Sequence, residues 1–128
     1  MTARASQQPP TRVFLVERVE QLANKIEDSL HQMGDRIGFE RTTNVSSAAR
    51  DLAYIDPDVV VINIDEMDTC EWNTLAKLRE VYPRLRFYGL SDNPKSNLPT
   101  TEVAEACHLP LVSSLDQLKQ ELSAARAV

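Results

Sequence analysis

Glycine is scarce in this sequence, whose 128 residues include only Gly34, Gly38 and Gly89. A glycine-rich phosphate loop of the P-loop or GxGxxG type needs several glycines within a few residues, so neither loop can form here. The sequence also lacks GxSxG and HExxH motifs, and it has only two histidines. A hydrolase with a nucleophile elbow and a zinc enzyme of the HExxH type are therefore excluded.

Cysteines and long apolar runs are also few or absent. Cys70 and Cys107 are the only cysteines, and their spacing matches no metal or redox motif. We therefore expect two free thiols in a reducing cytosol. No run reaches the roughly 18 apolar residues of a membrane span, so the sequence predicts no membrane contact. Residues 1–10 lack the apolar core of a secretory signal.

The remaining composition is ordinary for a globular domain, with 42% hydrophobic and 26% charged residues. The formal net charge is −5, which gives no basic surface and predicts that this domain binds no nucleic acid. The chain is long enough to bury a core without disulfides or metals. We expect a disordered lead-in at residues 1–11, rich in Ser, Gln and Pro, and one domain at residues 12–128.

From residue 12 onward, short apolar runs alternate with helical stripes. The run at residues 57–63, PDVVVIN, is β-branched without alternation, which is typical of a buried central strand. Other strands are predicted at 13–16, 37–43, 86–90 and 108–112, and helices at 19–33, 47–53, 72–81, 99–106 and 115–125, the last capped by Ser114. Five such units predict an α/β fold: a doubly wound, five-stranded parallel sheet between two layers of helices.

Four short stretches carry a resemblance to a known family. They are GFE at 38–40, PDVVVI at 57–62, LS at 90–91 and LDQL at 115–118. In this order and spacing they resemble motifs of the receiver domain of bacterial two-component response regulators, over residues 12 to 124. The resemblance implies the flavodoxin-like or CheY-like (βα)5 sandwich.

The resemblance also implies a phosphoacceptor aspartate at the end of the third strand, where this chain has Asn63. A neutral carboxamide forms no acyl phosphate, so Asn63 is interpreted as a degenerate phosphoacceptor position. The alternative, an ordinary strand-end amide that caps local backbone, stays open. Asp65 is a second, less favoured candidate acceptor. Ser91 matches the switch hydroxyl that closes the fourth strand in the family.

The other parts of the family's chemistry are lacking. The acidic pair that would bind Mg²⁺ is replaced by Glu17 and Arg18, and one carboxylate beside a guanidinium is a poor magnesium site. The lysine expected after the fifth strand is replaced by Leu109 or Leu111. We predict no metal, no cofactor and no catalytic residue. Arg18 is expected either to point to solvent or to move between Glu17 and Asp65 as an internal cation.

These features favour a pseudo-receiver: a non-enzymatic, cytoplasmic protein-interaction module that acts in bacterial signal transduction without phosphorylation. The resemblance implies a partner face formed by the fourth helix, fifth strand and fifth helix, and a homodimer through the same face. Specificity would come from residues 92–106. Two alternatives remain: an active response regulator that uses Asp65, and the N-terminal module of a larger transcription regulator or pilus-localising ATPase.

Overall fold

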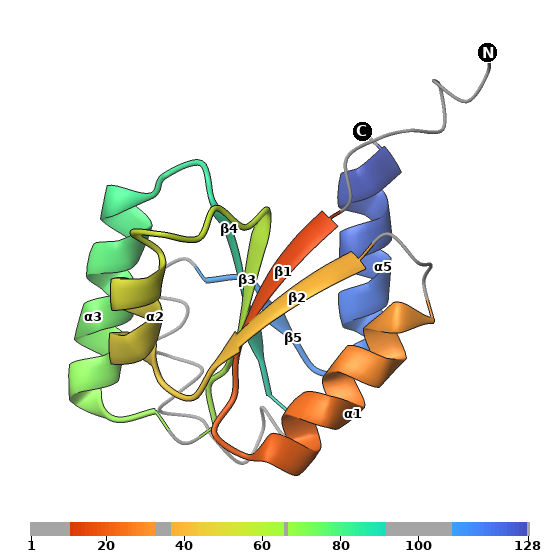
Figure 1. Ribbon diagram of the computed structural model, residues 1–128, viewed down its shortest axis with the longest axis horizontal. Helices are drawn as coiled ribbons and strands as arrows, with labels where there is room; N and C mark the ends of the chain where they lie inside the picture. The colour runs from red at the N-terminus through yellow and green to blue at the C-terminus, as the bar shows by residue number, and fades with distance from the viewer. Residues whose placement is uncertain (1–10, 33–36, 66, 92–108, 128) are drawn as a thin grey trace.

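The computed structural model describes residues 11–32, 37–65, 67–91 and 109–127. Its core is a five-stranded, all-parallel sheet with the strand order β2-β1-β3-β4-β5 (Figure 1). The described elements, in chain order, are β1 Thr11–Val16, α1 Glu20–His31, β2 Ile37–Thr42, α2 Val45–Asp51, β3 Val59–Asn63, α3 Thr69–Val81, β4 Arg86–Leu90, β5 Leu111–Val112 and α5 Leu115–Ala127. The predicted α/β fold is confirmed.

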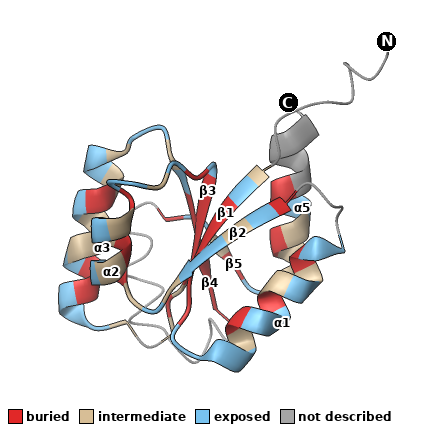
Figure 2. Cartoon of the chain, in the orientation of Figure 1, coloured by how far each residue is buried: buried red, intermediate tan, exposed pale blue. Residues whose placement is uncertain are grey.

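Helices cover both faces of the sheet, with α1 and α5 on one face and α2 and α3 on the other (Figure 1). Successive residues of β1 alternate between the two cores: Phe14 and Val16 pack with α2 and α3, whereas Val13 and Leu15 pack with α1 and α5. The central strands are consequently buried along their length (Figure 2). Their apolar sequence follows, because helices cover these central strands on both sides of the sheet.

Strand β3 lies at the centre of the sheet, between β1 and β4. Its first four residues are buried, and Asn63 emerges at its carboxyl end. In β4, a Cβ atom on Gly89 would come within 2.9 Å of methyl carbons of both Leu109 and Leu111. Glycine at this position lets the chain that leads into β5 pack closely against the sheet.

Side-chain caps set where three helices begin. Asn44 accepts a hydrogen bond from the backbone of Ser47 at 2.8 Å, so α2 begins two residues earlier than predicted. Asp68 caps α3 in the same way, which adds a turn before Trp72. Ser114 Oγ accepts from Gln117 N at 3.1 Å, so the predicted cap of α5 is confirmed.

Other boundaries differ from the prediction for local reasons. β1 begins at Thr11, inside the predicted lead-in, and β5 has two residues rather than five. Pro110 precedes β5 and has no N–H for a ladder, although its carbonyl accepts from Gly89 N at 2.8 Å. α1 ends at His31, one residue after its last buried leucine, Leu30, and two residues before the predicted end at 33. The predicted helix at 99–106 and residue 108 lie outside the described residues, as does Cys107.

No helix in the described ranges is long and apolar enough to cross a membrane. Cys70 is an exposed free thiol in the first turn of α3.

Candidate functional site

The strand order changes direction between β1 and β3, because the chain first adds β2 on one side of β1 and then β3 on the other. In open α/β sheets, ligands bind outside the carboxyl ends of the strands at such a point. Four of the residues predicted from the sequence lie there. Glu17 follows β1, Asn63 ends β3, Asp65 lies two residues further on, and Ser91 follows β4.

Glu17 is a buried carboxylate, with 6% of the residue exposed. One of its oxygens, Oε1, accepts a hydrogen bond from Asn63 Nδ2 at 2.6 Å. The other, Oε2, accepts from the backbone N–H of Val19 at 3.2 Å. Val19 is the N-cap residue of α1 and has no side-chain cap of its own, so Glu17 places a negative charge at the positive end of that helix. Both oxygens of the carboxylate are therefore used inside the protein.

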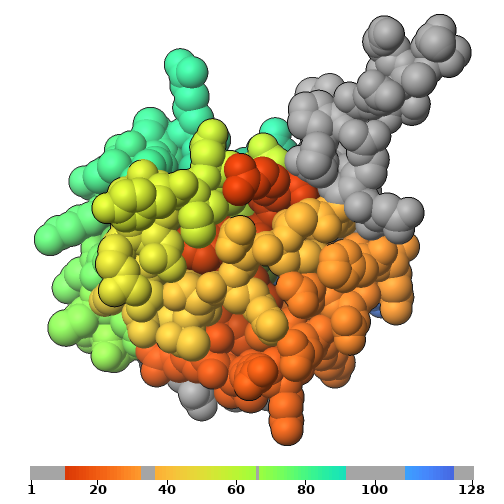
Figure 3. Space-filling model, viewed as in Figure 1, coloured from red at the N-terminus to blue at the C-terminus, as the bar shows by residue number. Residues whose placement is uncertain are grey.

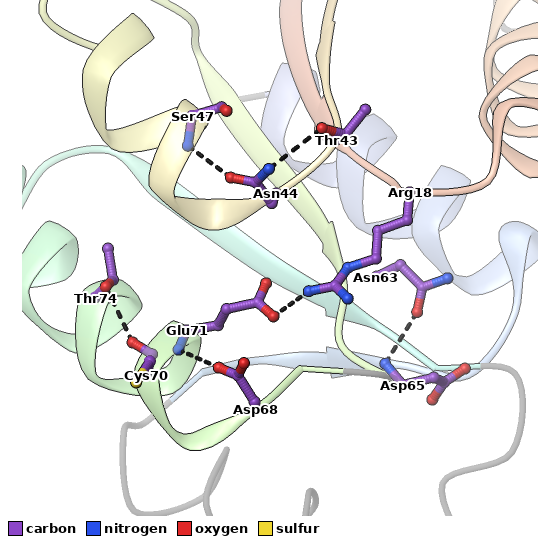
Figure 4. A network of polar contacts seen from close by, with 10 residues as sticks. All are labelled: Arg18, Thr43, Asn44, Ser47, Asn63, Asp65, Asp68, Cys70, Glu71 and Thr74. Carbon is purple, nitrogen blue, oxygen red and sulfur yellow. Dashed lines mark hydrogen bonds and ion pairs between the residues drawn. The ribbon is translucent and has the colours of Figure 1, made fainter.

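The amide of Asn63 is hydrogen-bonded on both sides. Nδ2 donates to Glu17. Oδ1 accepts from the backbone N–H of Asp65 at 3.0 Å, as Figure 4 shows. The two partners fix the orientation of the amide, because a carboxylate can only accept and a backbone N–H can only donate. An aspartate at residue 63 could accept from Asp65 N but could not donate to Glu17. The position is therefore fitted to a carboxamide.

Ser91 continues this chain of hydrogen bonds. Its hydroxyl donates to Asp65 Oδ1 at 2.5 Å, and its backbone N–H donates to the carbonyl of Val112 in β5 at 3.1 Å. The residue is 2% exposed. The series Glu17, Asn63, Asp65 and Ser91 thus connects the carboxyl ends of β1, β3 and β4, and Ser91 extends it to β5. We call these four residues the amide network.

Arg18 forms an ion pair with Glu71, which lies in the first turn of α3. Its side chain reaches from the segment after β1 toward α3 (Figure 4). The Arg18 side chain is 44% exposed and the Glu71 side chain is 11% exposed. From the sequence, Arg18 was expected either to point to solvent or to move between Glu17 and Asp65, and Glu71 was not identified as a partner. Asp68 and Glu71 have the spacing of a capping box, and this pattern could have placed Glu71 in the first turn of α3 from the sequence.

A cleft of about 140 Å³ lies between the amide network and this ion pair. Its charged lining consists of Glu17, Arg18, Asp65 and Glu71, and apolar side chains from β1, α1 and α2 complete it. The described residues bring together no group of three or more His, Cys, Asp or Glu side chains that could hold a metal ion. The Mg²⁺ site implied by the family does not fit here, because Arg18 lines the cleft and both oxygens of Glu17 have partners.

The position after β5 departs from the sequence prediction. β5 ends at Val112, so the residue that follows it is Ser113, whereas Leu111 lies inside the strand and Leu109 is buried before it. The backbone N–H and the hydroxyl of Ser113 both donate to Gln117 Oε1, at 2.9 and 3.0 Å. The predicted register of Leu109 or Leu111 is therefore corrected to Ser113. No lysine occupies this position in either register.

We expect the Arg18–Glu71 ion pair to make a measurable contribution to the stability of the fold. Arg18→Ala is expected to lower the free energy of unfolding by about 1 kcal/mol, the upper end for partly exposed pairs, because the Glu71 carboxylate stays mostly buried. Urea denaturation measures the change. Arg50→Ala is the matched control, since the Arg50–Asp51 pair is more exposed at 73% and 33%, and an effect near zero is expected. Equal losses in the two variants would contradict a special role for the Arg18–Glu71 pair.

Comparison with known proteins gives structural matches only. No protein-family model matches the chain, and no curated protein matches it. The structures similar to it include a putative pilus assembly-related protein from Burkholderia pseudomallei K96243, with 18% identity, a TM-score of 0.78, and coverage of 94% of this chain and 92% of that chain.

Two response regulators are also similar. RcsB of Salmonella typhimurium has 13% identity and a TM-score of 0.77 over 94% of this chain, which spans only 61% of the RcsB chain. The chemotaxis response regulator CheY4 of Vibrio cholerae has 12% identity and a TM-score of 0.70, with coverage of 90% of this chain and 98% of that chain. Together with the strand order, these likenesses show that the chain has the fold of CheY-like receiver domains.

Proposed function

We propose that this chain is a receiver-like module of bacterial signal transduction that works through protein contacts and without phosphorylation. The observation that supports the proposal is the amide of Asn63, held between Glu17 and Asp65 at the carboxyl end of the central strand. A carboxamide is a poor nucleophile and forms no acyl phosphate. The proposal makes the chain a binding protein rather than an enzyme.

The amide network also supports a signalling state that needs no phosphoryl group. A ligand shifts a conformational equilibrium only as far as it binds one state more tightly than the other. In this chain the hydroxyl of Ser91 already donates to an internal carboxylate, that of Asp65. The ends of β3 and β4 are thereby joined by the protein's own side chains. Under this proposal, regulation comes from a protein partner, from the abundance of the chain or from a small ligand.

The proposed partner face includes β5 and α5, together with residues 92–106, which lie outside the described residues. On α5, Asp116, Gln120 and Glu121 are exposed. Two of these three side chains carry negative charge, so a partner with basic groups would match this face. A homodimer through the same surface remains part of the proposal. In such a dimer, Asp116 and Glu121 of one copy would have to lie away from the same residues of the other copy, because like charges repel.

The first test is chemical. The full chain is incubated with acetyl phosphate and Mg²⁺, and its intact mass is measured. In a separate experiment beryllofluoride is added, and the fluorescence of Trp72, a buried residue of α3, is followed. We expect no added phosphoryl mass and no saturable change in fluorescence. Added mass that disappears in Asp65→Asn would overturn the proposal in favour of an active regulator with its acceptor at Asp65.

The second part of this test concerns the partner. Tagged wild-type and Asp65→Asn chains should recover the same protein in equal amounts, before and after phosphatase treatment of the extract. Glu121→Lys should reduce the recovery, because it reverses a charge on the proposed face. Glu80→Lys on α3 is the control, since Glu80 is also exposed but lies on the opposite layer. Recovery that is lost after phosphatase treatment would contradict a phosphorylation-independent contact.

The likeness to the Burkholderia protein supports a second candidate, a regulatory module in pilus assembly. The match covers nearly the whole of both chains. Under this candidate the partner is a component of the pilus machinery, and the receiver-like chain serves to position it. The likeness to part of RcsB supports, in the same way, a module of a larger transcription regulator. The identity of the recovered partner separates the candidates.

A further inference from the structure

A second hollow lies beyond the amino ends of the strands, at the opposite end of the sheet from the cleft. It has a volume of about 620 Å³ and lies between the connection from α2 to β3, residues 52–58, and the connection from α3 to β4, residues 81–85. These two segments lie next to one another at the upper left of Figure 3. We call this hollow the tyrosine groove, because Tyr54 and Tyr82 both line it.

The tyrosine groove is lined by both polar and apolar side chains, and two of the apolar ones are large and exposed. Three large hydrophobic side chains are exposed among the described residues, Tyr54 at 88%, Val81 at 66% and Val19 at 43%, and the first two line this groove. Pro57 and Pro83 line it as well. Exposed apolar side chains that gather in one hollow mark an interaction surface more often than scattered ones do.

The described chain begins beside the rim of this groove, where Arg12 contacts Asp58. The backbone N–H of Arg12 donates to Asp58 Oδ2 at 2.7 Å, and the backbone N–H of Asp58 donates to the Arg12 carbonyl at 2.9 Å. The Arg12 guanidinium donates to the carbonyl of Asp56 at 3.4 Å. Asp56 and Asp58 both line the groove. Residues 1–10, which lie outside the described residues, therefore join the domain beside it.

The sequence of this segment suits an aromatic groove. Residues 7–10 have the sequence QQPP, and proline as a residue type favours the polyproline II conformation. Proline-rich segments in that conformation bind in grooves lined by aromatic side chains, because little conformational entropy is lost on binding. The segment contains Arg4 and no acidic residue, and the groove is lined by Asp56, Asp58 and Arg84, so the proline–aromatic match rather than charge favours this occupant.

We propose that the proline-containing N-terminal segment, residues 7–10, binds in the tyrosine groove of its own chain. Covalent attachment at Arg12 gives the segment a high effective concentration there, which favours it over a second copy. Bound in this way, the segment covers Tyr54 and Val81. The proposal is independent of the proposed signalling function, because it concerns the edge of the sheet that carries neither the amide network nor the partner face.

The test compares ¹⁵N-labelled full chain with the variant Pro9→Ser/Pro10→Ser, which keeps the length of the segment. We expect amide chemical shifts to change in residues 52–58 and 81–85 and to remain unchanged at Asn63, Asp65 and Glu71. Shifts that are the same in both proteins would overturn the proposal. Shifts that depend on protein concentration would also overturn it, since they would indicate that a second copy occupies the groove.

A second measurement uses a synthetic peptide of residues 1–10, titrated into the full-length Pro9→Ser/Pro10→Ser variant, whose own segment is expected not to compete. We expect saturable binding that Tyr54→Ala weakens about 3- to 10-fold, the amount expected for loss of one aromatic contact. Tyr54 is exposed, so this variant is expected to fold normally. Val19→Ala, which removes the exposed hydrophobic side chain outside the groove, should leave peptide binding unchanged. Equal weakening by both substitutions would contradict a specific groove.

Discussion

Asn63→Asp is expected to lower the free energy of unfolding by about 2–4 kcal/mol at pH 7. The substitution removes the hydrogen that Asn63 Nδ2 donates to Glu17 over 2.6 Å and places a second carboxylate against a residue that is 6% exposed. Two close carboxylates in a buried position repel one another, and neither can donate while both are ionised. Asn63→Asp, which puts an aspartate at the family's acceptor position, is therefore expected to destabilise the fold. Urea denaturation of the two proteins measures the difference.

The matched control exchanges donor and acceptor. In the double variant Glu17→Gln/Asn63→Asp, the amide lies at residue 17 and the carboxylate at residue 63, so one hydrogen bond and one negative charge are kept. We expect the double variant to recover more than half of the stability lost in Asn63→Asp. Because the two residues are in direct contact, their effects should be strongly non-additive. A double variant less stable than Asn63→Asp would show that the hydrogen bond is not the cause.

Trp72→Ala is expected to cost about 3–5 kcal/mol of unfolding free energy, the range for large aromatic side chains in a core. Trp72 is 6% exposed and packs in the core that α2 and α3 form with one face of the sheet. Removal of the indole would leave a void next to β3, which carries Asn63 at its end. The loss is large compared with the total stability of a typical domain, so the variant should unfold at much lower urea concentrations.

Tyr54→Ala is the control for Trp72→Ala, because both substitutions remove an aromatic ring but Tyr54 is 88% exposed. Its effect on stability should be within about 0.5 kcal/mol, as for most surface substitutions. Thermal denaturation of both variants gives a second measurement. If Tyr54→Ala proved as destabilising as Trp72→Ala, the contrast between a core position for Trp72 and a surface position for Tyr54 would be wrong.

The sequence predicted the sheet well where a residue's environment follows from local pattern. The run of β-branched residues that ends at Asn63 requires burial on both sides, and the structure places this run at the centre of the sheet. Ser114 was identified as a cap because capping depends on residues close in sequence. The length of β5 was overestimated, since apolar composition outweighed the missing N–H of Pro110. Asn44 as the cap of α2 was also missed.

The candidate site was predictable only in part. Strand ends at one edge of a parallel sheet must be neighbours, and this brought Glu17, Asn63 and Ser91 together correctly. The pairing of Arg18 with Glu71 was not predictable from strand order, because it joins residues 53 positions apart through a long, flexible side chain. The direction of such a side chain depends on which carboxylate the neighbouring helix presents, and that depends on where the cap of α3 starts the helix.

The parallel arrangement of the strands separates the cleft from the tyrosine groove. The cleft lies beyond the carboxyl ends of the strands and the groove beyond their amino ends, so the five residues of β3 hold them roughly 16 Å apart. Substitutions at that separation, with no shared neighbours, usually have additive effects. A variant altered at the carboxyl ends of the strands can thus be combined with one altered at their amino ends, and the two changes in stability should add.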